Sequence, residues 1–128
     1  MALSMDQIYQ EILRDGGETP SKKVRETAQR FPDMIAMRYK EFGLWQETTY
    51  EDFWLKSNYL GMALRHFGVE KGNSVAIHSE NRPEWMISDL SIMLSGGVTV
   101  PAYTTYTERD YEYIIDDCSP TVLIISDK

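Results

Sequence analysis

A run of aromatic and hydroxyl side chains, Tyr103-Thr104-Thr105-Tyr106-Thr107, is the stretch of sequence best suited to binding a ligand. It leaves a predicted strand at the carboxyl end and leads into a predicted helix, whose first backbone N–H groups can bind an anion. Threonine hydroxyls and tyrosine rings could also hold a nucleotide there. The alternative is structural, with Thr107 capping the helix and the tyrosines packing. The run is therefore a candidate binding surface with two open interpretations.

Few other residues have the types and spacing of a catalytic or metal site. Neither glycine pattern of a phosphate-binding loop is present, and Gly96-Gly97 precedes a predicted strand, which favours a tight turn. His66 and His78 are the only histidines, and neither belongs to a cluster with metal-ligand spacing. Cys118 lies in a helical apolar stripe, which is typical of a core thiol rather than a nucleophile. We expect neither a catalytic residue nor a metal ligand.

Three short apolar runs must position the candidate surface: Ser74–His78, Val98–Ala102 and Val122–Ser126. Each is rich in β-branched or small residues and is bounded by turn residues, which suits a strand buried on both faces. Helical patterns separate the runs, so the order is strand, helix, strand, helix, strand. This order predicts an α/β fold, a three-layer parallel sheet of the flavodoxin or Rossmann kind. The carboxyl ends of its strands, at Ser79-Glu80-Asn81 and Tyr103-Thr104-Thr105, are where such sheets bind ligands.

The two helices between these strands have different patterns. The first, from Trp85 to Leu94, is apolar on most sides and is expected to be enclosed by protein, with Asn81 as a candidate cap. The second follows Thr107, which forms a near-capping box with Asp110. Its apolar residues follow the helical spacing and predict that one face packs on the sheet: Tyr111, Ile114, Ile115 and Cys118.

Helices and a β-hairpin are predicted before the sheet. An amphipathic helix is expected over residues 4–15. A second helix opens at Thr19-Pro20, with Val24, Ala28 and Phe31 on its buried face. Alternation then predicts strands at Met34–Glu41 and Trp45–Thr49, joined by a three-residue loop, Phe42-Gly43-Leu44. A long helix capped by Thr49 runs to about Phe67, and its stripe includes Phe53 and Leu64.

Composition excludes several classes of protein. The chain has 128 residues, which suits one domain or part of one, and 42% of them are hydrophobic. Its net charge of −7 disfavours nucleic acid as a partner, because phosphate binding needs clustered Lys and Arg. The single cysteine forms no intrachain disulfide. The sequence has neither a signal-peptide pattern nor an apolar run long enough to cross a membrane, so we expect a cytoplasmic location.

Several short motifs occur in the order and spacing found in adenylate-forming (AMP-binding) enzymes. They are Phe31-Pro32-Asp33, Thr49-Tyr50-Glu51-Asp52-Phe53, Gly68-Val69-Glu70-Lys71-Gly72, Val75-Ala76-Ile77, Asn81-Arg82-Pro83-Glu84-Trp85, Gly96-Gly97-Val98-Thr99-Val100-Pro101 and Ile114-Ile115-Asp116-Asp117-Cys118. The sequence most closely resembles long-chain fatty-acid–CoA ligases (acyl-CoA synthetases). The resemblance implies the acyl-CoA synthetase fold, with residues 1–128 as the N-terminal part of its large AMP-binding domain. Within that part we expect an N-terminal helix at 1–18, helix-hairpin-helix at 19–73 and the parallel βαβαβ unit at 74–128.

The resemblance also implies a reaction for the whole enzyme. A fatty acid reacts with ATP, with Mg2+ present, to give an acyl-adenylate, and coenzyme A then forms the thioester. By the same resemblance, Tyr103, Thr104 and Thr105 lie on the coenzyme A nucleotide side, although the related acetyl–CoA ligases have a glycine-rich turn there. Peripheral membrane attachment of the whole enzyme is compatible with it.

The family's phosphate loop, ribose-binding Asp and C-terminal lysine have no counterpart in the sequence. We therefore expect the chain to be inactive alone, with no cofactor bound to it and the remainder of a longer chain as its partner. One alternative is a stand-alone flavodoxin-like module that binds a nucleotide or a protein. Another is pairing of the chain with a second copy through exposed apolar surface, giving a homo-oligomer.

Overall fold

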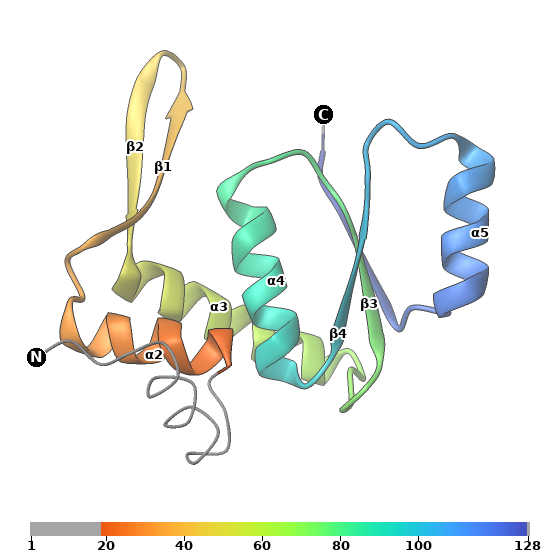
Figure 1. Ribbon diagram of the computed structural model, residues 1–128, viewed down its shortest axis with the longest axis horizontal. Helices are drawn as coiled ribbons and strands as arrows, with labels where there is room; N and C mark the ends of the chain where they lie inside the picture. Colours follow the sequence, from red (N-terminus) through yellow and green to blue (C-terminus); the bar gives the residue numbers. More distant parts are fainter. Residues whose placement is uncertain (1–18, 128) are drawn as a thin grey trace, which may run out of the picture.

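The computed structural model describes residues 19–127, so the helix expected at residues 4–15 lies outside the described part. The elements, in chain order, are α2 (Pro20–Arg30), β1 (Ile35–Glu41), β2 (Leu44–Thr49), α3 (Tyr50–His66), β3 (Ser74–His78), α4 (Pro83–Ser95), β4 (Val98–Ala102), α5 (Glu108–Cys118) and β5 (Val122–Ile125). Figure 1 shows the hairpin standing apart from the second half of the chain, where the strands and helices alternate. No helix in the described part has the length and apolar character needed to cross a membrane.

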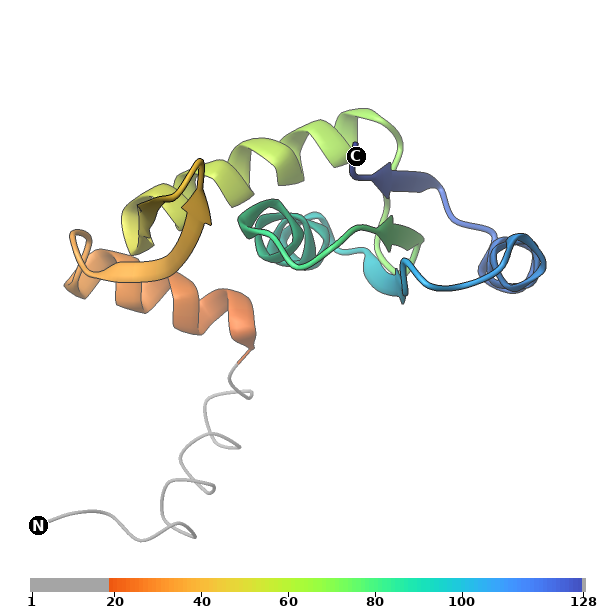
Figure 2. The same cartoon turned by 90° about the horizontal axis from the view of Figure 1, so that it is seen from above.

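The second half forms the expected parallel sheet. Its strand order is β4-β3-β5, and Ala76 of the central strand pairs with Val100 on one side and Leu123 on the other. Helices α3 and α4 lie on one face of this sheet and α5 lies on the opposite face (Figure 2). The prediction of a three-layer α/β architecture is therefore confirmed.

The core lies between this sheet and the α3–α4 layer. Its buried centre comprises Leu64, Val69, Val75, Ile77 and Ile92. Val75 and Ile77 are alternate residues of β3, so both side chains enter the same layer. Burial of large apolar side chains stabilises this arrangement by roughly 1.5–3 kcal/mol each. The core fixes α4, and therefore the start of α4, against the sheet.

Close packing of α3 on α4 depends on Gly61. A Cβ atom at this position would lie 3.2 Å from the Ser91 carbonyl oxygen and 3.4 Å from Leu94 Cβ. The two helices are also joined where Arg65 Nη1 donates a 3.0 Å hydrogen bond to the Ser95 carbonyl, near the end of α4. A cation at that end interacts favourably with the helix dipole. Both contacts hold α4 in a fixed register on α3.

The hairpin turn is shorter than expected. The three-residue loop predicted at 42–44 is wrong, because Leu44 already pairs with Glu41 and the turn contains only Phe42 and Gly43. Both turn residues have positive φ, 49° and 80°. Positive φ at both central positions is the geometry that matches the twist of a two-stranded ribbon, and glycine supplies it readily. The Phe42 side chain is 98% exposed at the tip.

The helix starts agree with the sequence except at α4. Thr49 and Thr107 each accept a backbone N–H from their own helix, as predicted, and Thr19 does the same at the start of α2. Helix α4 begins at Pro83 with Arg82 as its N-cap, so the assignment of Asn81 as the cap is wrong. Proline is favoured at the first helical position, which places the cap one residue before it. Arg82 makes no side-chain capping bond, and the start of α4 is open.

Two apolar faces are less buried than expected. In α5 the predicted sheet-facing residues are only half-buried, and Ile115 is exposed. In α2 the chain buries Ala28, while Phe31 at the C-cap is exposed. The helical spacing correctly predicted which face of α2 and of α5 is apolar. Within the described part of the chain, however, no other element covers either face completely.

Candidate functional site

The carboxyl ends of β3 and β4 open into a cavity of about 510 Å³, which we call the β3–β4 cavity. It is lined by Ser79, Glu80, Asn81, Trp85, Pro101, Ala102, Tyr103 and Thr104. Parallel strands bring their carboxyl ends to one edge, so segments that lie far apart in the sequence meet there. The start of α4 forms one wall, since Trp85 projects from its first turn. This cavity is the candidate functional site.

The structure brings together most of the residues that the sequence pointed to. Tyr103 and Thr104 line the cavity together with Ser79-Glu80-Asn81, whereas Thr105 does not line it. Sequence reasoning missed Trp85 as a wall of the cavity. Its place in an apolar helical pattern indicates burial but not that it borders a cavity.

Tyr111 fixes the loop that carries Tyr103. Its hydroxyl donates a hydrogen bond to the Tyr103 carbonyl and lies 2.7 Å from His78 Nε2. Since a tyrosine hydroxyl has one hydrogen, this pattern makes His78 Nε2 the donor in the second bond. The rings of Tyr103 and Tyr106 meet edge to face, with centroids 5.3 Å apart. His78 thus serves as a hydrogen-bonding partner that helps to hold the loop.

The N-terminus of α5 is closed by its own side chains. Thr107 and Asp110 form a capping box, in which the Thr107 N–H donates to Asp110 Oδ2 at 2.9 Å. The hydrogen bonds from the Thr107 hydroxyl and N–H lower the pKa of the Asp110 carboxyl. A carboxylate therefore already occupies this positive helix end. Of the two interpretations of the run 103–107, the structure supports Thr107 as a cap.

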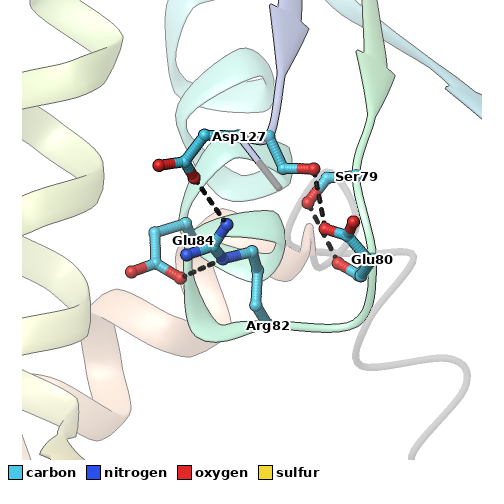
Figure 3. A network of polar contacts seen from close by, with 6 residues as sticks. Ser79, Glu80, Arg82, Glu84 and Asp127 are labelled. Carbon is cyan, nitrogen blue, oxygen red and sulfur yellow. Dashed lines mark hydrogen bonds and ion pairs between the residues drawn. The ribbon is translucent and has the colours of Figure 1, made fainter.

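The loop between β3 and α4 is tied to the end of β5 by a polar network (Figure 3). Arg82 Nε lies 3.1 Å from Glu84 Oε2, and Arg82 Nη1 lies 3.2 Å from Asp127 Oδ1. Ser126 donates a 2.7 Å hydrogen bond to Glu80 Oε2. This bond is the main reason that the pKa of Glu80 is lowered, while the hydrogen bond to Asp127 raises the pKa of Arg82.

The lining indicates which groups the β3–β4 cavity can hold. It offers hydroxyls, an amide and aromatic rings, with Glu80 as its only charged side chain. Without a lysine or arginine the cavity suits an uncharged planar or amide-containing group better than a phosphate. Within residues 19–127 no cluster of three or more His, Cys, Asp or Glu side chains could hold a metal ion. The lining of the β3–β4 cavity therefore has the chemistry of a binding surface.

Comparison with known proteins gives the family. A family model described as AMP-binding enzyme matches residues 24–128, most of the chain. The chain belongs to the AMP-binding enzyme family. The resemblance stated from the sequence motifs is therefore confirmed, and the β3–β4 cavity lies inside the matched region.

Curated relatives of the chain include long-chain-fatty-acid–CoA ligases and a fatty acyl-CoA synthetase. The long-chain-fatty-acid–CoA ligase ACSBG1 of Bos taurus is 29% identical over 99 residues, covering 77% of this chain and 14% of that enzyme. Fatty acyl-CoA synthetase A of Dictyostelium discoideum is 34% identical over 80 residues, covering 62% of this chain and 12% of that enzyme. The chain thus spans about one-seventh of the length of the curated relatives it matches.

Solved structures give the same architecture. The N-terminal subdomain of Klebsiella oxytoca NpsA, in complex with 3-hydroxyanthranilyl-AMSN, superposes with a TM-score of 0.77 at 28% identity. The match covers 86% of this chain and 27% of that one. A fatty acid AMP ligase from Legionella pneumophila superposes with a TM-score of 0.76 over 82% of this chain and 19% of its own, and at 18% identity it shows the fold alone. The described fold is that of the N-terminal part of adenylate-forming enzymes.

Proposed function

We propose that this chain forms the N-terminal part of a long-chain fatty-acid–CoA ligase. The observation that carries the proposal is the family match over residues 24–128, together with relatives that are fatty-acid–CoA ligases. Such an enzyme uses ATP and coenzyme A, and in the proposed reaction a fatty acid first becomes an acyl-adenylate and then a thioester. Because the chain spans a small share of its relatives, the activity belongs to a longer assembly of domains, in which this part is scaffold and one wall of a binding site.

The β3–β4 cavity is proposed to receive an uncharged part of coenzyme A. Tyr103 offers an aromatic ring on which a nucleobase can stack, and Thr104 offers a hydroxyl beside it. The Tyr111 hydroxyl holds the Tyr103 backbone and so fixes the loop in place before ligand arrives. No step of adenylate chemistry is assigned to the described residues, and no side-chain cluster among them fits Mg2+.

A graft into a relative tests the proposed function. Residues 24–128 would replace the matching segment of ACSBG1 of Bos taurus, and thioester formation from a long-chain fatty acid, ATP and coenzyme A would be measured. We expect the chimera to be active and the isolated chain to be inactive. A folded, soluble chimera that makes neither acyl-adenylate nor thioester would contradict the proposal, as would turnover by the isolated chain.

Variants of the chimera separate the two half-reactions. Tyr103→Ala and Thr104→Val should raise the KM for coenzyme A about tenfold, equivalent to loss of one good contact, while ATP–pyrophosphate exchange stays unchanged. Thr105→Val is the matched control, since Thr105 does not line the cavity and its replacement should change neither. An equal loss in both half-reactions would argue against the coenzyme A assignment.

A further inference from the structure

A second cavity lies between β3 and β5, on the other side of the β3–α4 loop. This β3–β5 cavity has a volume of about 280 Å³, and its walls include Ile77, Trp85 and Ile124, with Arg82 and Asp127 at the rim. The chain adds β4 on one side of β3 and then crosses to add β5 on the other, so the strand order reverses here. Open α/β sheets bind ligands in the crevice at such a reversal.

Ser88 explains why the β3–β5 cavity exists. Trp85, Ser88 and Ile92 follow one another at i, i+3 and i+7 on α4. Ile92 belongs to the buried core, and Trp85 is partly buried and packs against it. A small residue between two large ones leaves a hollow against the sheet, and Ser88 lines it. Its side chain is therefore at a core position, with a hydroxyl in place of an apolar group.

The Ser88 hydroxyl has no hydrogen-bond partner among residues 19–127, although the residue is only 4% exposed. Its neighbours in α4 differ: the hydroxyls of Ser91 and Ser95 donate to the carbonyls of Ile87 and Ile92. Among the described residues, the one fully buried side-chain polar atom without a partner is Ser57 Oγ, so the Ser88 oxygen keeps some accessible surface and can be reached from the cavity that it lines. A polar atom of a ligand in the cavity would provide the missing partner.

Arg82 lies at the rim of the cavity, and its guanidinium group can give up its present ion-pair partner for another anion. Two of the five N–H donors of Arg82 are engaged, one with Glu84 and one with Asp127. The Asp127 side chain is 94% exposed, and ion pairs this exposed are weak. Asp127 shows that a carboxylate fits against Arg82 at this rim. Helix α4 has no side-chain cap, and Glu84 in its first turn already places a carboxylate near the positive helix end.

We propose that the β3–β5 cavity binds a small organic carboxylate that carries a second polar group. The ligand carboxylate replaces Asp127 on Arg82, its apolar body packs against Trp85 and Ile124, and its second polar group hydrogen-bonds to Ser88. The proposal does not depend on the proposed function, because it concerns the isolated chain and a different cavity. A small carboxylate need not be an activated fatty acid or any part of coenzyme A.

The test is an NMR titration of the 128-residue chain with 6-hydroxyhexanoate. Backbone amide shifts of Ser88 report on the β3–β5 cavity, and those of Thr104 report on the β3–β4 cavity. We expect saturable shifts at Ser88 with a Kd of roughly 1 mM, as befits a ligand of this size, and none at Thr104. Hexane-1,6-diol, which lacks the charge, and inorganic phosphate, which lacks the apolar body, should each bind at least about tenfold more weakly.

Variants assign each contact. Arg82→Gln should weaken binding at least about tenfold, whereas Asp127→Asn should tighten it severalfold by removing the competing carboxylate. Hexanoate should bind the parent chain more weakly than 6-hydroxyhexanoate does. In Ser88→Ala the two ligands should bind with equal affinity, whereas in Ser91→Ala hexanoate should remain the weaker ligand. Far-UV circular dichroism checks that each variant is folded, and the exposed Asp127 can be changed without loss of core packing.

Any one of four results would overturn the proposal. The first three are absence of saturation at Ser88, unchanged affinity in Arg82→Gln, and weaker rather than tighter binding in Asp127→Asn. Equal affinity for inorganic phosphate would identify an adventitious ion only and would also overturn it.

Discussion

Glu80 is the carboxyl group whose ionisation is most closely tied to the candidate site. Its side chain accepts a hydrogen bond from Ser126 across the sheet edge, and this bond is the leading cause of its lowered pKa. A carboxyl whose pKa is lower in the folded chain stabilises the fold fully above its ordinary pKa. That contribution disappears as the pH falls through the folded value, in the range below about pH 4.

Ser126→Ala should therefore raise the pKa of Glu80 toward its ordinary value and reduce the acid resistance of the fold. The measurement is a carbon-13 NMR titration of the Glu80 carboxyl, together with unfolding at two pH values. Ser79→Ala is the matched control, because the Ser79 hydroxyl donates to the Glu80 backbone carbonyl and not to its carboxylate. An unchanged Glu80 pKa in Ser126→Ala would show that the hydrogen bond is not its cause.

Single residues also mark the limit of sequence reasoning at the site. That Tyr103 and Thr104 line a cavity could be predicted, because both directly follow the carboxyl end of β4. Trp85 and Ser88 could not, since the sequence shows only an apolar helix with serines in it, and only packing on β3 and β5 reveals which side chain borders a hollow. Asn81 is not the cap of α4, because Pro83 takes the first helical position and Arg82 the position before it.

Among the helices, the contact of α3 with α4 sets the position of the whole α4 layer. Gly61 lies where the helices approach most closely, with the Ser91 carbonyl in the way of any side chain. A carbonyl held in a helix cannot rotate aside, so a larger residue must push the helices apart. The helical period predicted both helices, but it did not indicate that a glycine would be buried between them.

Gly61→Val should lower the free energy of unfolding by about 2 kcal/mol, the usual cost of overpacking. Urea denaturation followed by circular dichroism measures the change. The neighbouring Met62→Val is the control, because Met62 is exposed and such changes fall within about 0.5 kcal/mol. A loss as large in Met62→Val would point to β-branching in the helix, rather than to crowding, as the cause.

Strands and helices were predictable where one pattern dominated, as in the three parallel strands. The wrong predictions concern features that depend on contacts between elements, which a local sequence pattern does not contain. The hairpin turn at Phe42 and Gly43 is one residue shorter than predicted, because strand pairing continues through Leu44. Helix α5 shows the expected apolar spacing, yet Ile115 stays exposed, because burial depends on what lies opposite.

At the scale of the molecule, the described sheet ends in two bare edges, β4 and β5. Exposed apolar side chains stand at both, including Val98 on β4 and Ile125 on β5. Unpaired edge strands with apolar side chains are templates for pairing with another chain. We expect the isolated chain to self-associate as its concentration rises.

Comparison of Val98→Lys with Ile125→Lys should identify whether β4 or β5 is the edge through which two copies of the chain pair. Lysine on an edge strand opposes pairing, so the variant at the edge that pairs should sediment as a monomer while the other still associates. Sedimentation velocity over a range of concentrations measures this. A parent chain that stays monomeric at high concentration would contradict the expectation.

The separation of the β1–β2 hairpin from the three-stranded sheet has a consequence for how the chain opens. The hairpin joins the body at its base, where the Tyr50 N–H donates to the Met34 carbonyl and the Glu51 N–H to the Pro32 carbonyl. Strands β1 and β2 pair only with each other, and no strand of the three-stranded sheet extends their two-stranded sheet. Tyr39 and Glu41 occupy the hydrogen-bonded positions of β1, because Glu41 and Leu44 flank a two-residue turn and bonded pairs alternate along an antiparallel ladder. Their amide protons should therefore exchange with solvent through local fraying, long before those of Val75 and Ile77, which must await global unfolding.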